Sequence, residues 1–523
     1  MSSQEGTVYA TYRVRTESPE RAKDVEAIAE AIAYEQTVEL PPALVPDPIR
    51  ERVVGQTTSI QEVGEYHFDV TLAFNAKLAD VNLSQLLNLI YGNVSIYDGV
   101  RLVDLSLPDV VLANYRGPNF GVEGVRALTG VHNRPLLATA LKPNGATPDA
   151  LAEMAHQFAL GGGNIVKDDQ NIVDDFTHFK TRVIACAEAV ARANDRTGKT
   201  CLYFPHVSAP ASTLRRQLEF VRDLGLKGVL LCPFITGLDT VRQVIADTGL
   251  VHMAHPAMTG SFTNPRDSGV DHGVLLGSLF RLAGADISIF PNKGGRFSFS
   301  EQTCQKITQY LRAPLGNLAP SLPSPGGGMH YENLGEMGAM YGEDSVLLVG
   351  GGLIGHKSNL TDATRSFIDE IESHFPDASV RPARLRSDDR SEDFAERLLK
   401  FSSDFQWQSR PSSPYKDASD DSFKGVRRIE LIGKYAEKTN TDLRYFEIEP
   451  GGYSSREHHQ HTHVVIGARG QGVLLIGNER MILNKDDVAW IEPQEVHQLR
   501  NETNEPFGFY CIVDHERDRP IRV

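Results

Sequence analysis

A short stretch, GNIVKDDQN, places charged and amide side chains at the carboxyl end of an apolar, strand-like run. Side chains two apart along a strand share a face, so we expect Lys167 and Asp169 to point one way and Asp168 the other. A lysine beside a carboxylate can form a plain buried ion pair. It can also form a metal site, because a neutral lysine amine adds carbon dioxide to become a carbamate, and Mg²⁺ prefers such oxygen ligands. Gln170, just past the strand, can bend inward and offer an amide oxygen.

Two glycine runs follow two later strand-like stretches. Their members are Gly326, Gly327, Gly328, Gly350, Gly351 and Gly352. Glycine lets backbone N–H groups approach an anion because no Cβ holds the backbone away. A tight turn would use glycine as well. Two runs at two strand ends favour a phosphate site, for which we select Gly327, Gly328, Gly350 and Gly351.

A histidine cluster lies near the C-terminus. The stretch EHHQHTH carries four histidines within six residues, and EPQEVHQLRN adds His497. Surface polarity explains such a cluster poorly, whereas imidazoles are common ligands of divalent transition metals. The sequence therefore predicts a second metal site, separate from the first.

These groups need elements that bring them together. From residue 135, eight short apolar runs alternate with helix-like stretches, the pattern of a (β/α)8 barrel. Polar residues stand at the carboxyl ends of these runs, where barrel enzymes keep their chemistry. They are Lys142, Lys167, Asp169, His206, His255 and Asn292.

The whole chain divides into four expected parts. Residues 1–130 mix strands and helices as an α+β domain, and residues 131–384 form the TIM barrel. Residues 385–423 are rich in Ser, Asp and Arg and are expected to be a linker. Residues 424–523 alternate short strands with glycine turns, as an all-β barrel does. The predicted fold class is α/β, with an α+β domain before the barrel and an all-β barrel after it.

Composition limits the partners and the compartment. The 523 residues include 53 basic and 68 acidic side chains, for a formal charge of −15, and no dense basic run, so no nucleic-acid partner is expected. The five scattered cysteines indicate reduced thiols. No run of eighteen apolar residues occurs. We expect a cytoplasmic protein with no membrane partner.

Motifs spread over residues 5–380 resemble the RuBisCO superfamily. They are AIAYEQTVE, GNVSIYDGVRLVDLSLP, GPNFGVEGVRAL, RPLLATALKP, GGGNIVKDDQN, AHPAM, GGGMH and DSVLLVGGGLIGH. The resemblance implies that Lys142 abstracts a proton, that Lys167 is carbamylated, and that Asp169 binds Mg²⁺. It also implies that His255 belongs to the active site.

The resemblance further implies a homodimer with shared active sites, in which Glu35 and Asn93 of each subunit enter the barrel of the other. Departures from the family pattern matter equally. Gln170 stands where the family has a metal-binding glutamate, and Pro256 replaces an arginine that grips one phosphate. Arg296 falls roughly where the family's mobile-loop lysine lies. We therefore do not expect fixation of carbon dioxide.

The shared half of the family's reaction removes a proton beside a ketone and holds the enediolate on the metal. With one phosphate site left, the expected substrate is a phosphorylated keto sugar or keto sugar acid. AHPAM and FPNKGGRF look closer to relatives that decarboxylate sugar acids, or transfer or hydrolyse their carboxylate, so we rank this activity first. Isomerisation or enolisation of a methylthio-sugar phosphate ranks second. A non-catalytic sugar-phosphate-binding protein with a C-terminal sensor is the alternative outside enzymes.

The C-terminal stretches GGYSSREHHQHTHVVIGARGQG and EPQEVHQLRN resemble the two cupin motifs. The resemblance implies a Mn, Fe, Ni or Zn ion held by three histidines and one carboxylate. These ligands are Glu457, His459, His463 and His497, with His461 as the substitute for Glu457. The fusion suggests that the cupin catalyses a step linked to the barrel's reaction.

Overall fold

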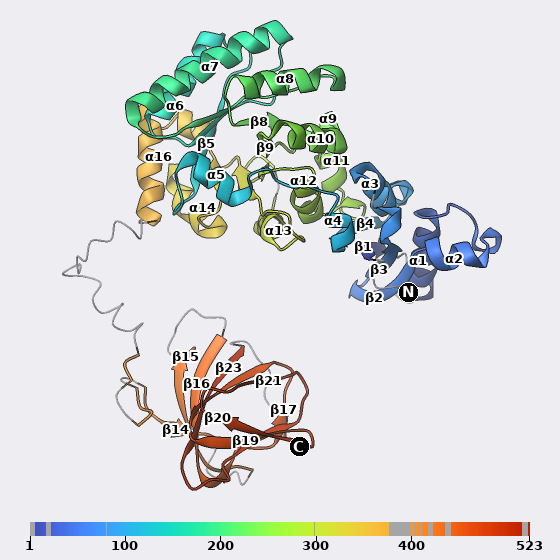
Figure 1. The fold of residues 1–523 in the computed structure, drawn as a ribbon, viewed down its shortest axis with the longest axis vertical. Helices are drawn as coiled ribbons and strands as arrows, with labels where there is room; N and C mark the ends of the chain where they lie inside the picture. The colour runs from blue at the N-terminus through green and yellow to red at the C-terminus, as the bar shows by residue number, and fades with distance from the viewer. Residues whose placement is uncertain are drawn as a thin grey trace. The chain divides into compact units, whose positions relative to one another are not determined.

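The computed structural model describes residues 6–16, 22–79, 81–297, 299–375, 399–401, 404–407, 410–416, 422–434, 441–514 and 521–522. The chain forms two compact units, Met1–Pro382 and Ala383–Val523. The first unit contains helices and strands, and the second is built of strands (Figure 1). Within the described ranges, no helix is long and apolar enough to cross a membrane.

A five-stranded sheet opens the first unit, in the order β10-β4-β1-β3-β2. Its strands are β1 (Thr7–Arg15), β2 (Gln56–Gly64), β3 (His67–Asn75), β4 (Val100–Ser106) and β10 (Gly269–Val270). Every second side chain of β1 and β3 is buried. These side chains share a core with helices α1 (Ala22–Glu35) and α3 (Leu83–Tyr91), and Tyr12 donates a hydrogen bond of 2.7 Å to Ile90 O. The result is an α+β layer.

Eight parallel strands follow, in the order β7-β6-β5-β13-β12-β11-β9-β8. They are β5 (Leu136–Leu141), β6 (Ile165–Asp168), β7 (Leu202–Phe204), β8 (Gly228–Leu231), β9 (Val251–Ala254), β11 (Ile287–Pro291), β12 (Leu322–Gly326) and β13 (Val346–Leu348). The ring closes just beyond β7, where Leu230 donates to Pro205 O at 2.9 Å and Val207 donates to Leu230 O at 3.0 Å. The expected barrel is confirmed.

Helices connect the barrel strands. The main ones are α6 (Pro148–Leu160), α7 (Phe176–Thr197), α8 (Ala211–Asp223), α10 (Leu238–Thr248), η4 (Gly273–Leu279) with α12 (Phe280–Leu282), α13 (Glu301–Arg312), α14 (Leu334–Tyr341) and α16 (Leu360–His374). Side chains from alternate strand positions fill the barrel interior. Val122 and Val125 of α5 (Gly121–Thr129) belong to this same core, so α5 supports it from outside the ring.

A buried carboxylate ties α5 to the strands. Asp286, just before β11, accepts hydrogen bonds from the N–H groups of Phe120 and Gly121, at 2.7 and 2.8 Å, and from His252 N–H at 2.8 Å. Burial raises the pKa of Asp286 to about 6, although these donors oppose the shift. The carboxylate thus satisfies backbone donors at the start of α5 that would otherwise lack partners.

Strand β10 links the barrel to the N-terminal sheet, in which it is an edge strand. Gly269 and Val270, which belong to the barrel's chain segment, pair in parallel with Arg101 and Leu102 of β4. The Arg101 guanidinium also donates to three carbonyl oxygens, those of Thr263, Pro265 and Ser268, at 2.7–3.1 Å. These bonds fasten the N-terminal domain to the barrel.

The second unit is an all-β barrel with the path β20-β19-β22-β16-β23-β18-β21. Its strands are β14 (Ser413–Pro414), β15 (Lys424–Ile432), β16 (Thr441–Tyr453), β17 (Glu457–His458), β18 (His463–Arg469), β19 (Gln471–Ile476), β20 (Glu479–Asn484), β21 (Val488–Ile491), β22 (His497–Arg500), β23 (Phe507–Asp514) and β24 (Ile521–Arg522). Part of the expected linker lies outside the described residues. Another part packs on this barrel, since Phe405 stacks on Tyr445 with ring centroids 5.1 Å apart.

Candidate active site and metal centre

A cavity of about 1150 Å³ opens at the carboxyl ends of the first barrel's strands. Three kinds of residue line it. The polar residues include Lys142, Lys167, Asp169, Gln170, His255 and Arg296. The glycine edge comprises Gly326, Gly327, Gly328, Gly350, Gly351 and Gly352. The apolar wall includes Pro256, Met258, Ile289, Phe290, Phe297 and Phe299.

Two lysines flank one carboxylate in this cavity. Lys142 follows β5 directly, and its Nζ lies 2.5 Å from Asp169 Oδ2, just past β6. The side chain of Lys142 is 44% exposed, whereas Lys167 is 2% exposed. Burial lowers the pKa of Lys167 to about 8, and the positive charge of Lys142 adds to the shift, while Asp169 opposes it. Near neutral pH, Lys167 therefore has a sizeable neutral fraction.

Asp168 faces away from the cavity, as the strand alternation predicts. Its carboxylate forms an ion pair with Arg182 of α7 and accepts hydrogen bonds from Tyr203 OH and His206 N–H, both at 2.9 Å. The side chains of Asp168 and Arg182 are almost wholly buried, which makes the pair costly to break. This network fixes the end of β6 and so the direction in which Lys167 and Asp169 point.

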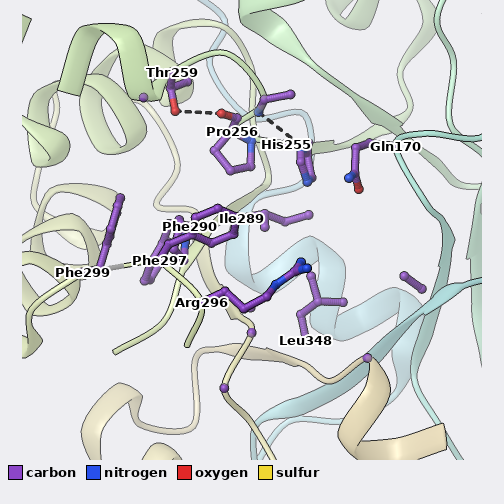
Figure 2. Close-up of a pocket in the computed structure, with 18 of the residues that line it drawn as sticks. Gln170, His255, Pro256, Thr259, Ile289, Phe290, Arg296, Phe297, Phe299 and Leu348 are labelled. Carbon is purple, nitrogen blue, oxygen red and sulfur yellow. Dashed lines mark hydrogen bonds between the residues drawn. The ribbon is translucent and has the colours of Figure 1, made fainter. Parts of the chain in front are cut away.

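His255 follows β9 and is a neutral imidazole. Burial lowers the pKa of His255 to about 3, helped by the positive charge of Lys167. Its Nδ1 accepts the N–H of Ala257 at 3.2 Å, so the ring proton resides on Nε2. Figure 2 shows the ring of His255 beside Gln170, on one side of the cavity. The arrangement offers an uncharged hydrogen-bond donor to a substrate oxygen.

The apolar wall extends from Pro256, beside His255, to Phe297 and Phe299. Phe297 and Phe299 stand away from Gln170 and His255, and the side chain of Arg296 reaches between the two sides (Figure 2). Sequence reasoning missed this wall, because Phe297 and Phe299 come from the loop after β11, which has no periodicity. Only the replacement of an arginine by Pro256 pointed to a less polar surface here.

The glycine edge is shaped by its backbone. Gly327 and Gly328 have φ of +86° and +69°, and a Cβ on Gly328 would lie 2.8 Å from Gly295. A Cβ on Gly352 would lie 2.4 Å from Met329 O, whereas Gly350 and Gly351 face open space. The edge therefore presents bare backbone to the cavity, as an anion site requires.

Glu35 and Asn93 do not line the cavity of their own barrel. They meet in the N-terminal domain, where Asn93 Nδ2 donates to Glu35 Oε1 at 2.9 Å. Two other strand-end residues also face elsewhere. His206 bonds Ile172 O through Nδ1 at 3.1 Å, and Asn292 accepts from Tyr341 OH on α14 at 2.6 Å.

The barrel residues fit a hard cation under one condition. With Lys167 as an amine, two lysines surround Asp169 and repel a cation. With Lys167 as a carbamate, its oxygens would join Asp169 and the amide of Gln170, which gives the oxygen donors that Mg²⁺ needs. The lowered pKa of Lys167 favours that modification, because only the neutral amine adds carbon dioxide.

The C-terminal barrel holds a histidine cluster. The ligand atoms of His459, His461 and His463 lie within 4.8 Å of one another, and the ring of His497 is 4.8 Å from that of His459. His459 Nδ1 bonds His461 O at 2.7 Å, while its Nε2 is buried without a partner. Burial lowers the pKa of His459 to about 4 and lowers those of His463 and His497. Neutral imidazoles with a buried, unsatisfied nitrogen fit a transition metal.

Glu457 is engaged elsewhere in the same barrel. Its carboxylate forms an ion pair with Lys416 and accepts from Ser455 Oγ at 3.0 Å. His461 Nε2, by contrast, lies 3.1 Å from His463 Nε2. Glu457 and His461 were the two candidates for one ligand position. Of these, the structure brings His461 into the cluster. Sequence spacing could not show this, because Lys416 lies 41 residues from Glu457.

Comparison with known proteins shows the family to which each barrel is similar. Residues 121–381 match the family described as ribulose bisphosphate carboxylase large chain, catalytic domain, and residues 444–513 match the cupin domain. Ribulose bisphosphate carboxylase-like protein 1 of Rhodopseudomonas palustris is 40% identical over 370 residues, which are 70% of this chain and 98% of that protein. The chain therefore belongs to the RuBisCO large-chain family and carries a cupin domain after it.

Its relatives are of the RuBisCO-like, form IV type. The 5-methylthioribulose-1-phosphate isomerase of Rhodospirillum rubrum is 39% identical over 366 residues, covering 69% of this chain and 95% of that protein. The crystal structure of a RuBisCO-like protein from Rhodopseudomonas palustris has a TM-score of 0.64 and 36% identity, covering 71% of this chain and 99% of that one.

Proposed function

We propose that the barrel transfers a proton on a phosphorylated keto sugar with an apolar tail, as an isomerase or enolase of the methylthioribulose-phosphate type. The apolar wall carries the proposal. A sugar bisphosphate needs a second cationic grip, whereas Pro256, Phe297 and Phe299 offer a surface for a thioether or alkyl end. The named activity of the relative from Rhodospirillum rubrum supports the same substrate class.

The mechanism follows from the positions of the charged groups. Lys142, as the free amine, takes the proton from the carbon beside the ketone and becomes the ammonium. The ion pair of that ammonium with Asp169, with Nζ 2.5 Å from Oδ2, holds Lys142 in the cavity. The neutral His255 donates its Nε2–H to the oxygen that gains charge. The glycine edge holds the single phosphate at the opposite strand ends. When bound by carbamylated Lys167, Asp169 and Gln170, Mg²⁺ supplies electrostatic stabilisation of the enediolate.

Decarboxylation of a keto sugar acid, or transfer of its carboxylate, is the second candidate. The Arg296 side chain, exposed within the cavity, favours it, because a guanidinium pairs with carboxylates. The sequence motifs place this activity first. We reverse the order because Pro256, Phe297 and Phe299 line the cavity with apolar surface, which a second acidic group does not need.

The test uses full-length protein in deuterated water with 5-methylthioribulose 1-phosphate, followed by NMR. We expect deuterium uptake, and a loss of about 10²- to 10⁴-fold in rate for Lys142→Ala. Lys199→Ala, an exposed lysine before β7, is the matched control. Uptake at the normal rate in Lys142→Ala would remove the lysine as base. Carbon dioxide release from a phosphorylated 3-keto sugar acid, without exchange on the methylthio-sugar, would favour the second candidate.

For the whole protein, we propose a homodimer in which Glu35 and Asn93 complete the partner's cavity, since they meet outside their own. We further propose that the cupin binds a divalent transition metal through His459, His461, His463 and His497 and catalyses a linked step.

Metal analysis of the purified chain tests the cupin centre. We expect about one bound transition-metal ion per chain, lost in His459→Ala and retained in His458→Ala. His458 is the matched control because it bonds Gln494 at 2.9 Å and stands outside the cluster. Retention of the ion in Glu457→Gln would agree with His461 as the ligand. Loss of the ion in that variant would assign the ligand position to Glu457 instead.

A further inference from the structure

The cupin barrel encloses a cavity of about 480 Å³ beside the histidine cluster. Its walls combine apolar and cationic side chains. The apolar residues are Val426, Phe446, Val465, Leu499 and Phe509, and the cationic ones are Lys416, Arg428 and Arg444. A metal site alone does not require these cations, and they differ in what they contact.

Two of the three cations are paired with carboxylates. Lys416 forms an ion pair with Glu457, and Arg428 Nε lies 3.0 Å from Glu430 Oε1. Their charges are therefore balanced within the barrel. Neither needs a ligand to compensate it.

Arg444 is different. Among the described residues, no carboxylate lies within 4.0 Å of its guanidinium, because Glu430, which lies opposite Arg444 in the β15–β16 ladder, pairs with Arg428 instead. The Nε atoms of Arg444 and Arg428 are both buried without a hydrogen-bond partner. Its Nη2 donates only to Cys511 Sγ, at 3.4 Å, and its guanidinium lies 5.3 Å from the ring centre of Phe446. Two carboxylates line the same cavity. Glu457 pairs with Lys416, and Asp442 Oδ1 lies against Gly433, where it would be 1.9 Å from an added Cβ.

An uncompensated cation in a largely apolar cavity is unfavourable unless an anion joins it. A guanidinium presents a planar fork of donors that matches a carboxylate or a phosphate. We propose that the cupin cavity binds a small organic oxyanion, whose carboxylate or phosphate pairs with Arg444 while its apolar part contacts Phe446 and Phe509. The bound molecule then lies beside the histidine cluster. This proposal does not depend on the reaction of the first barrel.

Calorimetric titration of the full-length protein, stripped of metal with EDTA, tests the proposal. The probes are isovalerate, isobutyl phosphate and the neutral isovaleramide. We expect at least one oxyanion to bind tenfold or more tightly than the amide, and Arg444→Met to reduce that preference to less than threefold. Arg500→Met, which alters an exposed arginine of β22, serves as the control and should keep it. The anion that binds more tightly shows whether the cavity recognises a carboxylate or a phosphate.

Removing an unpaired cation should leave the melting temperature of Arg444→Met unchanged or raise it. A lower melting temperature together with an unchanged oxyanion preference would make Arg444 a structural group and overturn the proposal. Oxyanion binding that requires added Zn²⁺ and ignores the Arg444 substitution would also overturn it. Should Arg444→Met fail to fold, Arg444→Lys keeps the charge without the fork and must weaken oxyanion binding at least threefold, with amide binding unchanged.

Discussion

Lys167 should be the lysine of this chain that reacts with carbon dioxide. Only a neutral amine forms a carbamate, and burial lowers the pKa of Lys167 from 10.5 to about 8. At pH 7.5 about a quarter of Lys167 is then neutral, against about one in a thousand for an ordinary lysine. The difference of more than a hundredfold selects this one side chain.

The amount of carbamate on Lys167 should also depend on pH. Raising the pH from 6.5 to 8.5 increases the neutral fraction of a group with a pKa of about 8 by about 25-fold. At a fixed concentration of dissolved carbon dioxide, carbamate should therefore rise steeply over this interval. Carbon-13 NMR of the full-length protein with labelled bicarbonate measures it directly. Mg²⁺ should raise the signal further, because the carbamate is one of its ligands.

Two variants make the experiment decisive. Lys167→Met should abolish the carbamate signal, and Lys199→Ala should leave it unchanged. A signal that survives in Lys167→Met would assign the carbamate to another lysine. The absence of a rise between pH 6.5 and 8.5 in the wild type would refute the lowered pKa, and with it the explanation of how a cation binds beside Lys142.

Three further outcomes are expected. Arg182→Met should lower the free energy of unfolding by about 3–5 kcal/mol in urea, because Asp168 is left buried and unpaired, and Asp168→Asn in the same chain should recover part of the loss. Gln170→Glu should lower the Mg²⁺ concentration for half-maximal activity by about tenfold, since a carboxylate replaces a neutral oxygen. Mixing inactive Lys142→Ala and Glu35→Gln chains should restore about a quarter of the wild-type activity if subunits share sites, and no recovery would exclude sharing.

Local backbone rules account for what the sequence could predict in the first barrel. The alternation of a strand depends only on the backbone, so the inward direction of Lys167 and Asp169 and the outward direction of Asp168 followed from their spacing. The eight apolar runs that alternate with helix-like stretches likewise predicted the barrel. Asn292, one residue past β11, turns to α14 as the same alternation requires, because it continues the face of Phe290 and not that of Ile289. Its position at a strand end was therefore not enough to place it in the cavity.

Contacts between distant segments were beyond sequence reasoning. The engagement of Glu457 depends on Lys416, which arrives from a segment that composition assigned to a linker. The apolar wall depends on loops after β9 and β11, whose course no periodic pattern specifies. That Arg444 meets Cys511 and no carboxylate among the described residues depends on how strands β15, β16 and β23 pair. In each case the missing information is tertiary rather than local.

Strand β10 gives the first unit an unusual mechanical property. The segment that precedes η4 is hydrogen-bonded into the N-terminal sheet, and Arg101 clamps the loop before it. The domain that carries Glu35 is therefore coupled to its own barrel through backbone hydrogen bonds. In a dimer with exchanged residues, substrate closing one cavity would pull on the groups that serve the other. Alternating, half-of-the-sites turnover would have a direct structural route in such an assembly.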